Sequence, residues 1–222
     1  MRSGVSNQIL RVNEIFFSIQ GEAGHAGWPC VFVRLGGCNL RCSYCDTTYA
    51  YEEWREMTVA AVVNEVRGFD CSLVEVTGGE PLIQQETPDL VEHLLDLGYT
   101  VLMETNGSQD ISRVDPRCIK IVDFKCPSSG QAEANDLGNI ERLQDHDEVK
   151  CVIANRRDFE FARGIYERVR ADRQRRSAVL FSPVFGELAP STLAEWILGE
   201  RLKVRLNLQL HKYIWDPRRR GV

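Results

Sequence analysis

The chain has 222 residues, 43% of them hydrophobic, and a formal net charge of −5. This composition excludes a disordered chain and is sufficient for a sizeable core. The negative charge argues against nonspecific binding to nucleic acid or to a membrane surface. Because the sequence shows neither a secretory signal nor an apolar segment of bilayer length, we expect a soluble, cytoplasmic protein with a single domain over residues 1–222.

Apolar stretches with the character of strands alternate with amphipathic stretches along the chain. We expect strands at residues 11–19, 30–37, 72–79, 100–107, 119–125, 148–154, 178–183 and 204–211. We expect helices at residues 58–69, 87–99, 156–170 and 190–199. Thr58 and Thr87 are the expected N-caps of the first two helices. This alternation predicts an α/β fold with mostly parallel strands, and the number of strands favours an incomplete (β/α) barrel.

Polar residues and glycines end or follow five of the predicted strands. They are the loop 38–47, Gly78 with Gly79, Thr105 with Asn106, Lys125 and His211. The carboxyl ends of parallel strands meet at one edge, and α/β folds bind their ligands at that edge. We therefore expect these residues to form one site.

Three of the eight cysteines lie close together. Cys38, Cys42 and Cys45 have the spacing C-x3-C-x2-C, whereas the other five are scattered, mostly among apolar neighbours. We interpret those five as buried or incidental thiols, because no secretory signal points to disulfides. A structural zinc site usually has four protein ligands. Zinc therefore remains an alternative only if a residue far along the chain supplies the fourth ligand. Three thiolates fit a 4Fe–4S cluster in which one iron lacks a protein ligand.

The three-cysteine loop after a strand resembles the radical S-adenosylmethionine superfamily. The resemblance implies that the free iron binds the amino and carboxylate groups of S-adenosylmethionine. One electron from the cluster then cleaves a carbon–sulfur bond and releases a 5′-deoxyadenosyl radical. The resemblance also implies contacts to this cofactor from Tyr44, Cys45, Asp46, Gly78, Gly79, Thr105, Asn106, Asp123, Phe124 and Lys125. Many members have Ser-Pro-Lys where this chain has Asp-Phe-Lys, so Lys125 is the best match in that stretch.

A longer resemblance narrows the reaction. The segment FFSIQGEAGHAGWPCVFVRLGGCNLRCSYCDT (16–47), followed by TGGEP (77–81), ETNG (104–107) and LQLHKYIW (208–215), is similar to the 7-carboxy-7-deazaguanine synthase family. These enzymes convert 6-carboxy-5,6,7,8-tetrahydropterin to 7-carboxy-7-deazaguanine in queuosine and deazapurine biosynthesis. The resemblance implies hydrogen abstraction from C6 of the pterin, ring contraction, loss of ammonia and regeneration of S-adenosylmethionine.

Residues in and near these motifs suit a flat, polar pterin that carries a carboxylate. Gln20 offers a donor and an acceptor, Glu22 accepts from N–H groups, and Arg34 presents a planar fork to a carboxylate. The resemblance implies substrate contacts by Ile19, Gln20, Gly21, Glu22, Arg34, Thr77 and His211, with a core histidine as the alternative for His211. It also implies that Thr47 is a ligand of Mg2+, which prefers oxygen donors. The sequence assigns no role in the site to the C-terminal segment WDPRRRGV (215–222).

A cluster of this kind needs an electron donor, and we expect flavodoxin or ferredoxin. The basic stretch RVRADRQRRS (168–177) is a candidate docking patch for such an acidic protein, although a solvated helix end is the simpler interpretation. The resemblance also implies a homodimer. Two alternatives stay open. One is a glycyl-radical-enzyme activase, which shares the cysteine spacing but leaves SIQGE and Arg34 unexplained, and the other is a zinc-binding structural module.

Overall fold

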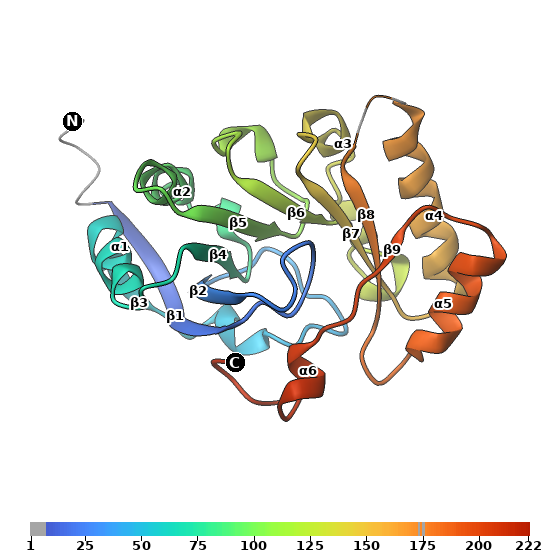
Figure 1. The fold of residues 1–222 in the computed structure, drawn as a ribbon, viewed down its shortest axis with the longest axis horizontal. Helices are drawn as coiled ribbons and strands as arrows, with labels where there is room; N and C mark the ends of the chain where they lie inside the picture. Colours follow the sequence, from blue (N-terminus) through green and yellow to red (C-terminus); the bar gives the residue numbers. More distant parts are fainter. Residues whose placement is uncertain (1–7, 173, 175) are drawn as a thin grey trace.

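The computed structural model describes residues 8–172, 174 and 176–222. Its strands are β1 (Ile9–Ile19), β2 (Pro29–Leu35), β3 (Arg55–Thr58), β4 (Leu73–Gly78), β5 (Thr100–Thr105), β6 (Ile119–Asp123), β7 (Glu148–Ile153), β8 (Ala178–Pro183) and β9 (Arg205–Leu206). Within the described residues these nine strands form one open sheet in the order β3-β1-β2-β4-β5-β6-β7-β8-β9. β1 runs antiparallel to β2 and β3, and the other neighbouring pairs are parallel. The predicted α/β fold with an incomplete, mostly parallel barrel is therefore confirmed (Figure 1).

Helices accompany both ends of the sheet. They are α1 (Val59–Arg67), α2 (Thr87–Asp96), α3 (Asn139–Arg142), α4 (Arg156–Ala171), α5 (Pro190–Gly199) and α6 (His211–Ile214). Figure 1 shows α1 and α2 beside the β1 end of the curved sheet, and α4 and α5 beside the β9 end. The short α6 and the C-terminus lie apart from these helices, below β2 in that view. In the part of the chain that the structure describes, no helix is long and apolar enough to cross a membrane.

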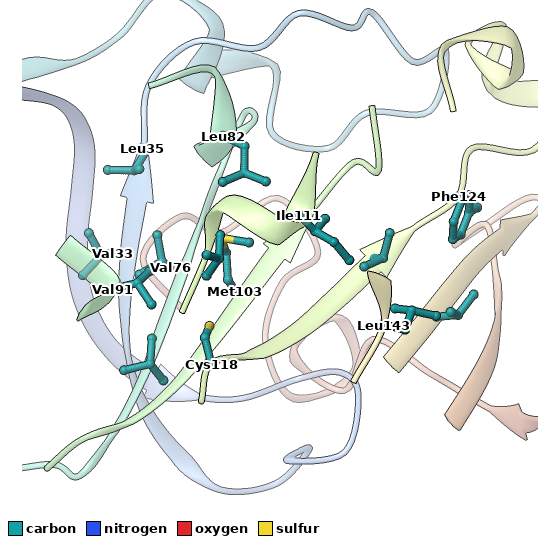
Figure 2. Packing of buried hydrophobic residues seen from close by; sticks show 14 of the residues in the cluster. Val33, Leu35, Val76, Leu82, Val91, Met103, Ile111, Cys118, Phe124 and Leu143 are labelled. Atoms are coloured by element: carbon teal, nitrogen blue, oxygen red, sulfur yellow. The ribbon is translucent and has the colours of Figure 1, made fainter. Parts of the chain in front are cut away.

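The parallel strands have an apolar face and a mixed face, because successive side chains point to opposite sides of a strand. Val76 of β4 and Met103 of β5 are fully buried in the main core, and Figure 2 shows them in one cluster with Val91 of α2. Glu75 and Glu104 are the immediate neighbours of Val76 and Met103 along the same strands, so their side chains point to the other face. This alternation carries charged groups to the inner side of the barrel.

The expected N-cap of the second helix is wrong, and one strand was not predicted. Glu86, and not Thr87, is the N-cap residue of α2, and Thr87 is the first residue of the helix. The hydroxyl of Thr87 donates to the carbonyl oxygen of Pro81 in the preceding turn at 2.6 Å, so it does not cap the helix. The strand β3 was not predicted, because its sequence REMT is polar and its strand conformation depends on pairing with the distant β1.

The last strand is much shorter than the predicted 204–211. It ends at Leu206. The N–H of Asn207 still donates to the carbonyl oxygen of Phe181 on β8 at 2.9 Å, while its side chain accepts from the N–H of Ala23 at 2.8 Å and donates to Oγ of Ser182 at 2.8 Å. Beyond Asn207 the regular pairing with β8 does not continue. His211 is consequently the first residue of α6 and does not follow a strand.

Candidate active site

A cavity of about 730 Å³ opens where the parallel strands end. The cysteine loop, the segment after β1 and the last residues of β4, β5, β6 and β7 line it. Every predicted site residue lines this cavity except Phe124. Phe124 is fully buried in the main core (Figure 2), because it alternates along the chain with Asp123, which faces the cavity. Within the stretch 123–125 that was predicted to contact the cofactor, the side chains of Asp123 and Lys125 therefore face the cavity and that of Phe124 does not.

Hydrogen bonds from neighbouring turns hold the cysteine loop in place. The N–H of Ser43 donates to the carbonyl oxygen of Ser129 at 3.1 Å. At the end of β5, Nδ2 of Asn106 donates to Oδ1 of Asn39 at 3.0 Å and lies 3.8 Å from Sγ of Cys38. Asn106 therefore contacts the loop itself, a role that its sequence motif did not reveal.

The three thiols of the cysteine loop line the same cavity. Burial raises the pKa of Cys38 and of Cys42, and the ammonium of Lys125 opposes that rise. Among the described residues, no three Cys, His, Asp or Glu side chains are grouped so that they could hold one metal ion. Cluster ligation distributes thiolates over several irons, whereas zinc draws its ligands to one point. Three thiols that line one cavity are therefore a donor set that fits a 4Fe–4S cluster with one iron left without a protein ligand.

Gly78 and Gly79 allow the turn after β4 to pass directly against the cysteine loop. A Cβ on Gly79 would lie 2.0 Å from the carbonyl oxygen of Gly37 and 2.9 Å from Cβ of Cys38. The N–H of Glu80 donates to that same carbonyl oxygen at 2.9 Å. Gly78 has φ of 140°, a conformation that side chains disfavour. Both glycines line the cavity, but the structure shows a further reason for them, namely close contact between two chain segments.

Glu80 joins this turn to the end of β5. Its carboxylate is fully buried and accepts from Oγ1 of Thr105 at 2.8 Å, from the N–H of Asn106 at 2.6 Å and from the N–H of Leu82 at 2.9 Å. The hydroxyl of Thr105 is thus engaged within the protein, although the residue lines the cavity. Glu80 therefore links the turn after β4 to the end of β5, two segments that are predicted to bind the cofactor.

Asp46 and Thr47 form a polar corner of the cavity. Oδ2 of Asp46 pairs with Nζ of Lys212 in α6 at 2.6 Å, and Oδ1 accepts from Oγ1 of Thr47 at 3.0 Å. Burial alone would raise the pKa of Asp46, but the ammonium of Lys212 outweighs burial and holds it well below its usual range. Tyr44 lies nearby in the cavity wall, where its hydroxyl donates to the carbonyl oxygen of Val152 at 3.4 Å. Lys212 was missed in the sequence because no local pattern links α6 to the cysteine loop.

Charged side chains meet on the inner wall of the cavity. Nζ of Lys150 lies 3.1 Å from Oε2 of Glu22 and 3.8 Å from Oδ2 of Asp123, and it also forms an ion pair with Glu104. Oδ2 of Asp123 pairs with Nζ of Lys125 at 2.7 Å. Oδ1 of Asp123 is buried and has no hydrogen-bond partner among the described residues. Because Asp123 lines the cavity, this unpartnered oxygen is available as an acceptor for a ligand.

Three residues of this wall, Glu75, Glu104 and Lys150, were missed in the sequence. Each is a charged residue within an otherwise apolar strand, in VEV, LMET and VKCV. A buried charge requires a partner, and that requirement is the signal that could have identified them. Their partners lie on other strands, so the sequence alone could not say which groups they meet.

Arg34 is oriented by two side chains that the sequence did not indicate. Its Nε donates to Oε1 of Glu14 at 2.8 Å, and the same oxygen accepts from the hydroxyl of Tyr49 at 3.1 Å. The guanidinium carbon lies 5.6 Å from the ring centroid of Phe16. In the described structure the two terminal nitrogens of Arg34 make no hydrogen bond, and the residue lines the cavity. This geometry leaves a fork free for a carboxylate ligand.

The C-terminal segment reaches the same cavity. His211 lies so close to Gly21 that a Cβ there would be 2.2 Å from its Nδ1, and burial lowers the pKa of His211. Residues 217–222 also line the cavity, although the sequence assigned no role to them. Arg220 fastens this tail, pairing with Glu53 at 2.9 Å while its guanidinium carbon lies 3.8 Å from the ring centroid of Tyr49.

Comparison with known proteins agrees with this geometry. Residues 32–120 match the model of the radical SAM superfamily. The chain is 47% identical to the 7-carboxy-7-deazaguanine synthase of Chlorobaculum tepidum, over 96% of this chain and 97% of that protein. It is 42% identical to the synthase of Koribacter versatilis, over 96% of this chain and 100% of that protein. The chain belongs to the 7-carboxy-7-deazaguanine synthase family. The fold is also similar to the crystal structure of QueE from Escherichia coli, with a TM-score of 0.77 and 24% identity over 91% of this chain and 95% of that chain.

Membership of the 7-carboxy-7-deazaguanine synthase family makes this protein an enzyme of the radical S-adenosylmethionine type, with a 4Fe–4S cluster and S-adenosylmethionine as its cofactors. Cys38, Cys42 and Cys45 line one cavity and are the three thiols that would hold the cluster. Neither the activase nor the zinc module finds support among the family matches.

In this synthase-family protein, replacing Gly79 with alanine is expected to displace the cysteine loop. The added methyl group would meet the backbone of Gly37, which cannot move away as a flexible side chain could. We expect a loss of about 1–3 kcal/mol of stability from overpacking, together with a lower iron content per chain. Gly164→Ala in α4 is the control, since nothing lies within 4 Å of its added Cβ. Normal iron content in Gly79→Ala would contradict the role of this contact.

Proposed function

We propose that this protein converts 6-carboxy-5,6,7,8-tetrahydropterin into 7-carboxy-7-deazaguanine and ammonia, the reaction of queuosine and deazapurine biosynthesis. One observation carries the proposal: a single cavity contains the three thiols of the cluster loop, the free fork of Arg34 and the wall that includes Gln20 and Glu22. A carboxylated pterin needs a cation for its carboxylate and acceptors for its N–H groups, and the cavity offers both. The name of the relatives at 42–47% identity supports the same reaction.

Three cysteines and the surrounding turns would hold the cofactors. When bound, the cluster and S-adenosylmethionine together supply a one-electron route to hydrogen abstraction from carbon. Tyr44, Cys45 and Asp46 in the loop, the Gly78 and Gly79 turn, Thr105 with Asn106, and Asp123 with Lys125 are the proposed contacts to S-adenosylmethionine. The orphaned Oδ1 of Asp123 supports this assignment, because a buried acceptor without a partner suits a hydroxyl or amine of a ligand.

The proposed substrate contacts lie around the rest of the cavity. Arg34 would bind the pterin carboxylate, and Glu22 would accept from its amino and ring N–H groups. Ile19, Gln20, Gly21, Thr77 and His211 complete the proposed set. Because burial lowers the pKa of His211, its imidazole is neutral near pH 7 and can either donate or accept a hydrogen bond.

We include Mg2+ in the proposal, with the hydroxyl of Thr47 as its protein ligand. Asp46 lies within hydrogen-bond distance of that hydroxyl and keeps its negative charge, which makes the corner favourable for a hard cation. A substrate carboxylate and water molecules would supply the remaining oxygens.

The proposal extends to partners and organisation. We propose a single-domain chain that acts in the cytoplasm as a homodimer, with flavodoxin or ferredoxin as the reductant. The candidate docking patch at residues 168–177 includes Arg173 and Arg175, which lie outside the described residues, so its support remains the basic sequence alone.

The proposed reaction is tested with anaerobically reconstituted protein. The protein is incubated with 6-carboxy-5,6,7,8-tetrahydropterin, S-adenosylmethionine, Mg2+ and a chemical reductant, and products are identified by mass spectrometry. We expect 7-carboxy-7-deazaguanine and ammonia in equal amounts, with S-adenosylmethionine not consumed. Protein with a complete, reducible cluster that yields no deazaguanine would overturn the proposal.

Replacing Glu14 with glutamine is expected to weaken substrate binding without touching the substrate. Glutamine cannot fix the guanidinium of Arg34 through a charged contact, so the fork is less well oriented. A penalty of about 1–2 kcal/mol corresponds to a roughly 5- to 30-fold higher KM for the pterin, with kcat close to the parent value. Glu56→Gln on β3, an exposed glutamate, is the control. A KM that stays unchanged in Glu14→Gln but rises in Arg34→Lys would contradict this positioning role.

A further inference from the structure

The inner wall of the cavity has more carboxyl groups than ammonium groups. Glu22, Glu75, Glu104 and Asp123 all line it, whereas the lysines of this wall are Lys125 and Lys150. The carboxyls come from the segment after β1 and from β4, β5 and β6, so the sheet itself brings them together. Such an excess of buried carboxyls is unfavourable unless some of them carry a proton or meet a donor-rich ligand.

The ion pairs leave one carboxyl without a cation. Lys150 contacts Glu22 and Asp123 and pairs with Glu104, and Lys125 pairs with Asp123. Glu75 makes no ion pair among the described residues. Its observed partner is neutral, since Nε2 of Gln20 donates to its Oε2. Glu75 is 4% exposed and lines the cavity, so its carboxyl faces the space where a ligand would bind.

The neighbours of Glu75 favour its protonated form. Burial raises its pKa to about 8, and the carboxylates of Glu104 on β5 and Glu22 after β1 add to the rise. The ammonium of Lys150 on β7 lowers the pKa of Glu75, but it also interacts with the carboxylates of Glu104, Glu22 and Asp123. Two thiols also interact with Glu75, Cys30 on β2 and Cys118 just before β6, and burial keeps both neutral because it raises the pKa of each above its ordinary value. Near pH 7 the proton that these neighbouring carboxyl groups share therefore resides on Glu75, the carboxyl that lacks a cation.

We propose that Glu75 is a specificity-determining residue that donates a hydrogen bond, as a neutral carboxylic acid, to an acceptor atom of the heterocyclic substrate. The proposal rests on the proposed function. Beside Glu75, the carboxylates of Glu22 and Glu104 accept hydrogen bonds. One donor beside two acceptors complements the edge of a 2-amino-4-oxopyrimidine ring, in which an amino group and a ring N–H lie beside a carbonyl oxygen. Glu75 recognises the carbonyl of that edge and selects against rings that present a donor there.

The test separates the donor role from charge and from chemistry. Binding of 6-carboxy-5,6,7,8-tetrahydropterin is measured by anaerobic calorimetry on the cluster-loaded protein with S-adenosylmethionine but without reductant, so that no turnover occurs. Glu75→Gln keeps an N–H donor and cannot ionise, whereas Glu75→Leu has similar size and no donor. Glu92→Gln, at an exposed position on α2, is the control.

We expect Glu75→Gln to bind within about 3-fold of the parent at pH 7, and Glu75→Leu to bind about 10- to 100-fold more weakly, as expected for an unpaired buried acceptor. The parent should lose affinity as the pH rises through about 8, because the donor proton leaves, while Glu75→Gln should not show this loss. The infrared band of a protonated carboxyl should also be present near pH 7 in the parent and absent from Glu75→Gln.

Three results would overturn the proposal. They are equal affinity of Glu75→Leu and the parent, weak binding by Glu75→Gln at pH 7, and the absence of the infrared band from the parent. If Glu75→Leu does not fold, the pH profile of Glu75→Gln and the infrared band still decide. In all these cases the parent continues to bind the pterin, so the proposed function stands. A parent protein that does not bind the tetrahydropterin at all overturns the proposed function and this inference with it.

Discussion

Cys42→Ala is expected to abolish both cluster binding and product formation. Cys42 lines the cavity beside Cys38 and Cys45, and a 4Fe–4S cluster that already lacks a fourth protein ligand cannot be held by two thiolates. The same outcome is expected for Cys38→Ala and Cys45→Ala. Iron and sulfide per chain, the visible absorbance and its bleaching on reduction measure the cluster, and formation of 7-carboxy-7-deazaguanine measures activity.

Cys71→Ala is the matched control for these variants. Its thiol lies away from the cavity, within 3.4 Å of the carbonyl oxygen of Pro29, so the variant should keep a normal cluster and normal activity. An intact cluster in Cys42→Ala would contradict the ligand assignment. Cluster loss in Cys71→Ala would show that the loop 38–45 is not a sufficient ligand set.

Lys150→Met is expected to cause the largest loss of stability among the cavity residues. Lys150 is buried and offsets the carboxylates of Glu22, Glu104 and Asp123. Removing one partner of a buried ion pair typically costs about 3–5 kcal/mol, because the remaining charges are uncompensated. The midpoint of denaturant unfolding measures this loss, compared at equal cluster content. Lys203→Met, at an exposed position, should change stability by less than about 0.5 kcal/mol.

The pH dependence of the Lys150→Met effect gives a sharper test. Without the ammonium, burial raises the pKa of Glu22 and Glu104 above their unfolded values, so the folded variant binds more protons than the unfolded chain. Its stability must then fall as the pH rises, and the difference from the parent should be larger at pH 8 than at pH 5. A difference that is below 1 kcal/mol or does not depend on pH would show that Lys150 is not the main counter-charge of this wall.

The strands and the larger helices were predictable because their signals are local. Apolar runs marked β2, β4 and β5, and helical periodicity marked α1 and α2. The errors arose where a distant segment decides the outcome. Pairing with β1 makes a strand of REMT. Where the sequence predicts that the last strand continues, the side chain of Asn207 instead bonds to Ala23 and Ser182.

Most of the candidate site was predictable because its residues lie in motifs next to strand ends. The three cysteines, Gly78 with Gly79, and Arg34 line the cavity as expected. The exception is Phe124, because the motif DFK carries no information on which of its side chains faces inward. Period-two alternation from Asp123 places Phe124 in the core instead.

The sequence by itself determined the alternating α/β order, the cysteine spacing and the family resemblance, because each depends on residues that are close along the chain. Only the tertiary structure decided which charges share a wall, how Glu14 orients Arg34 and that the C-terminal tail reaches the cavity. Lys150 and Glu22 are 128 residues apart in the sequence, yet they are ion-paired in the folded protein. Such contacts form because a curved sheet directs alternate side chains of distant strands to one inner face.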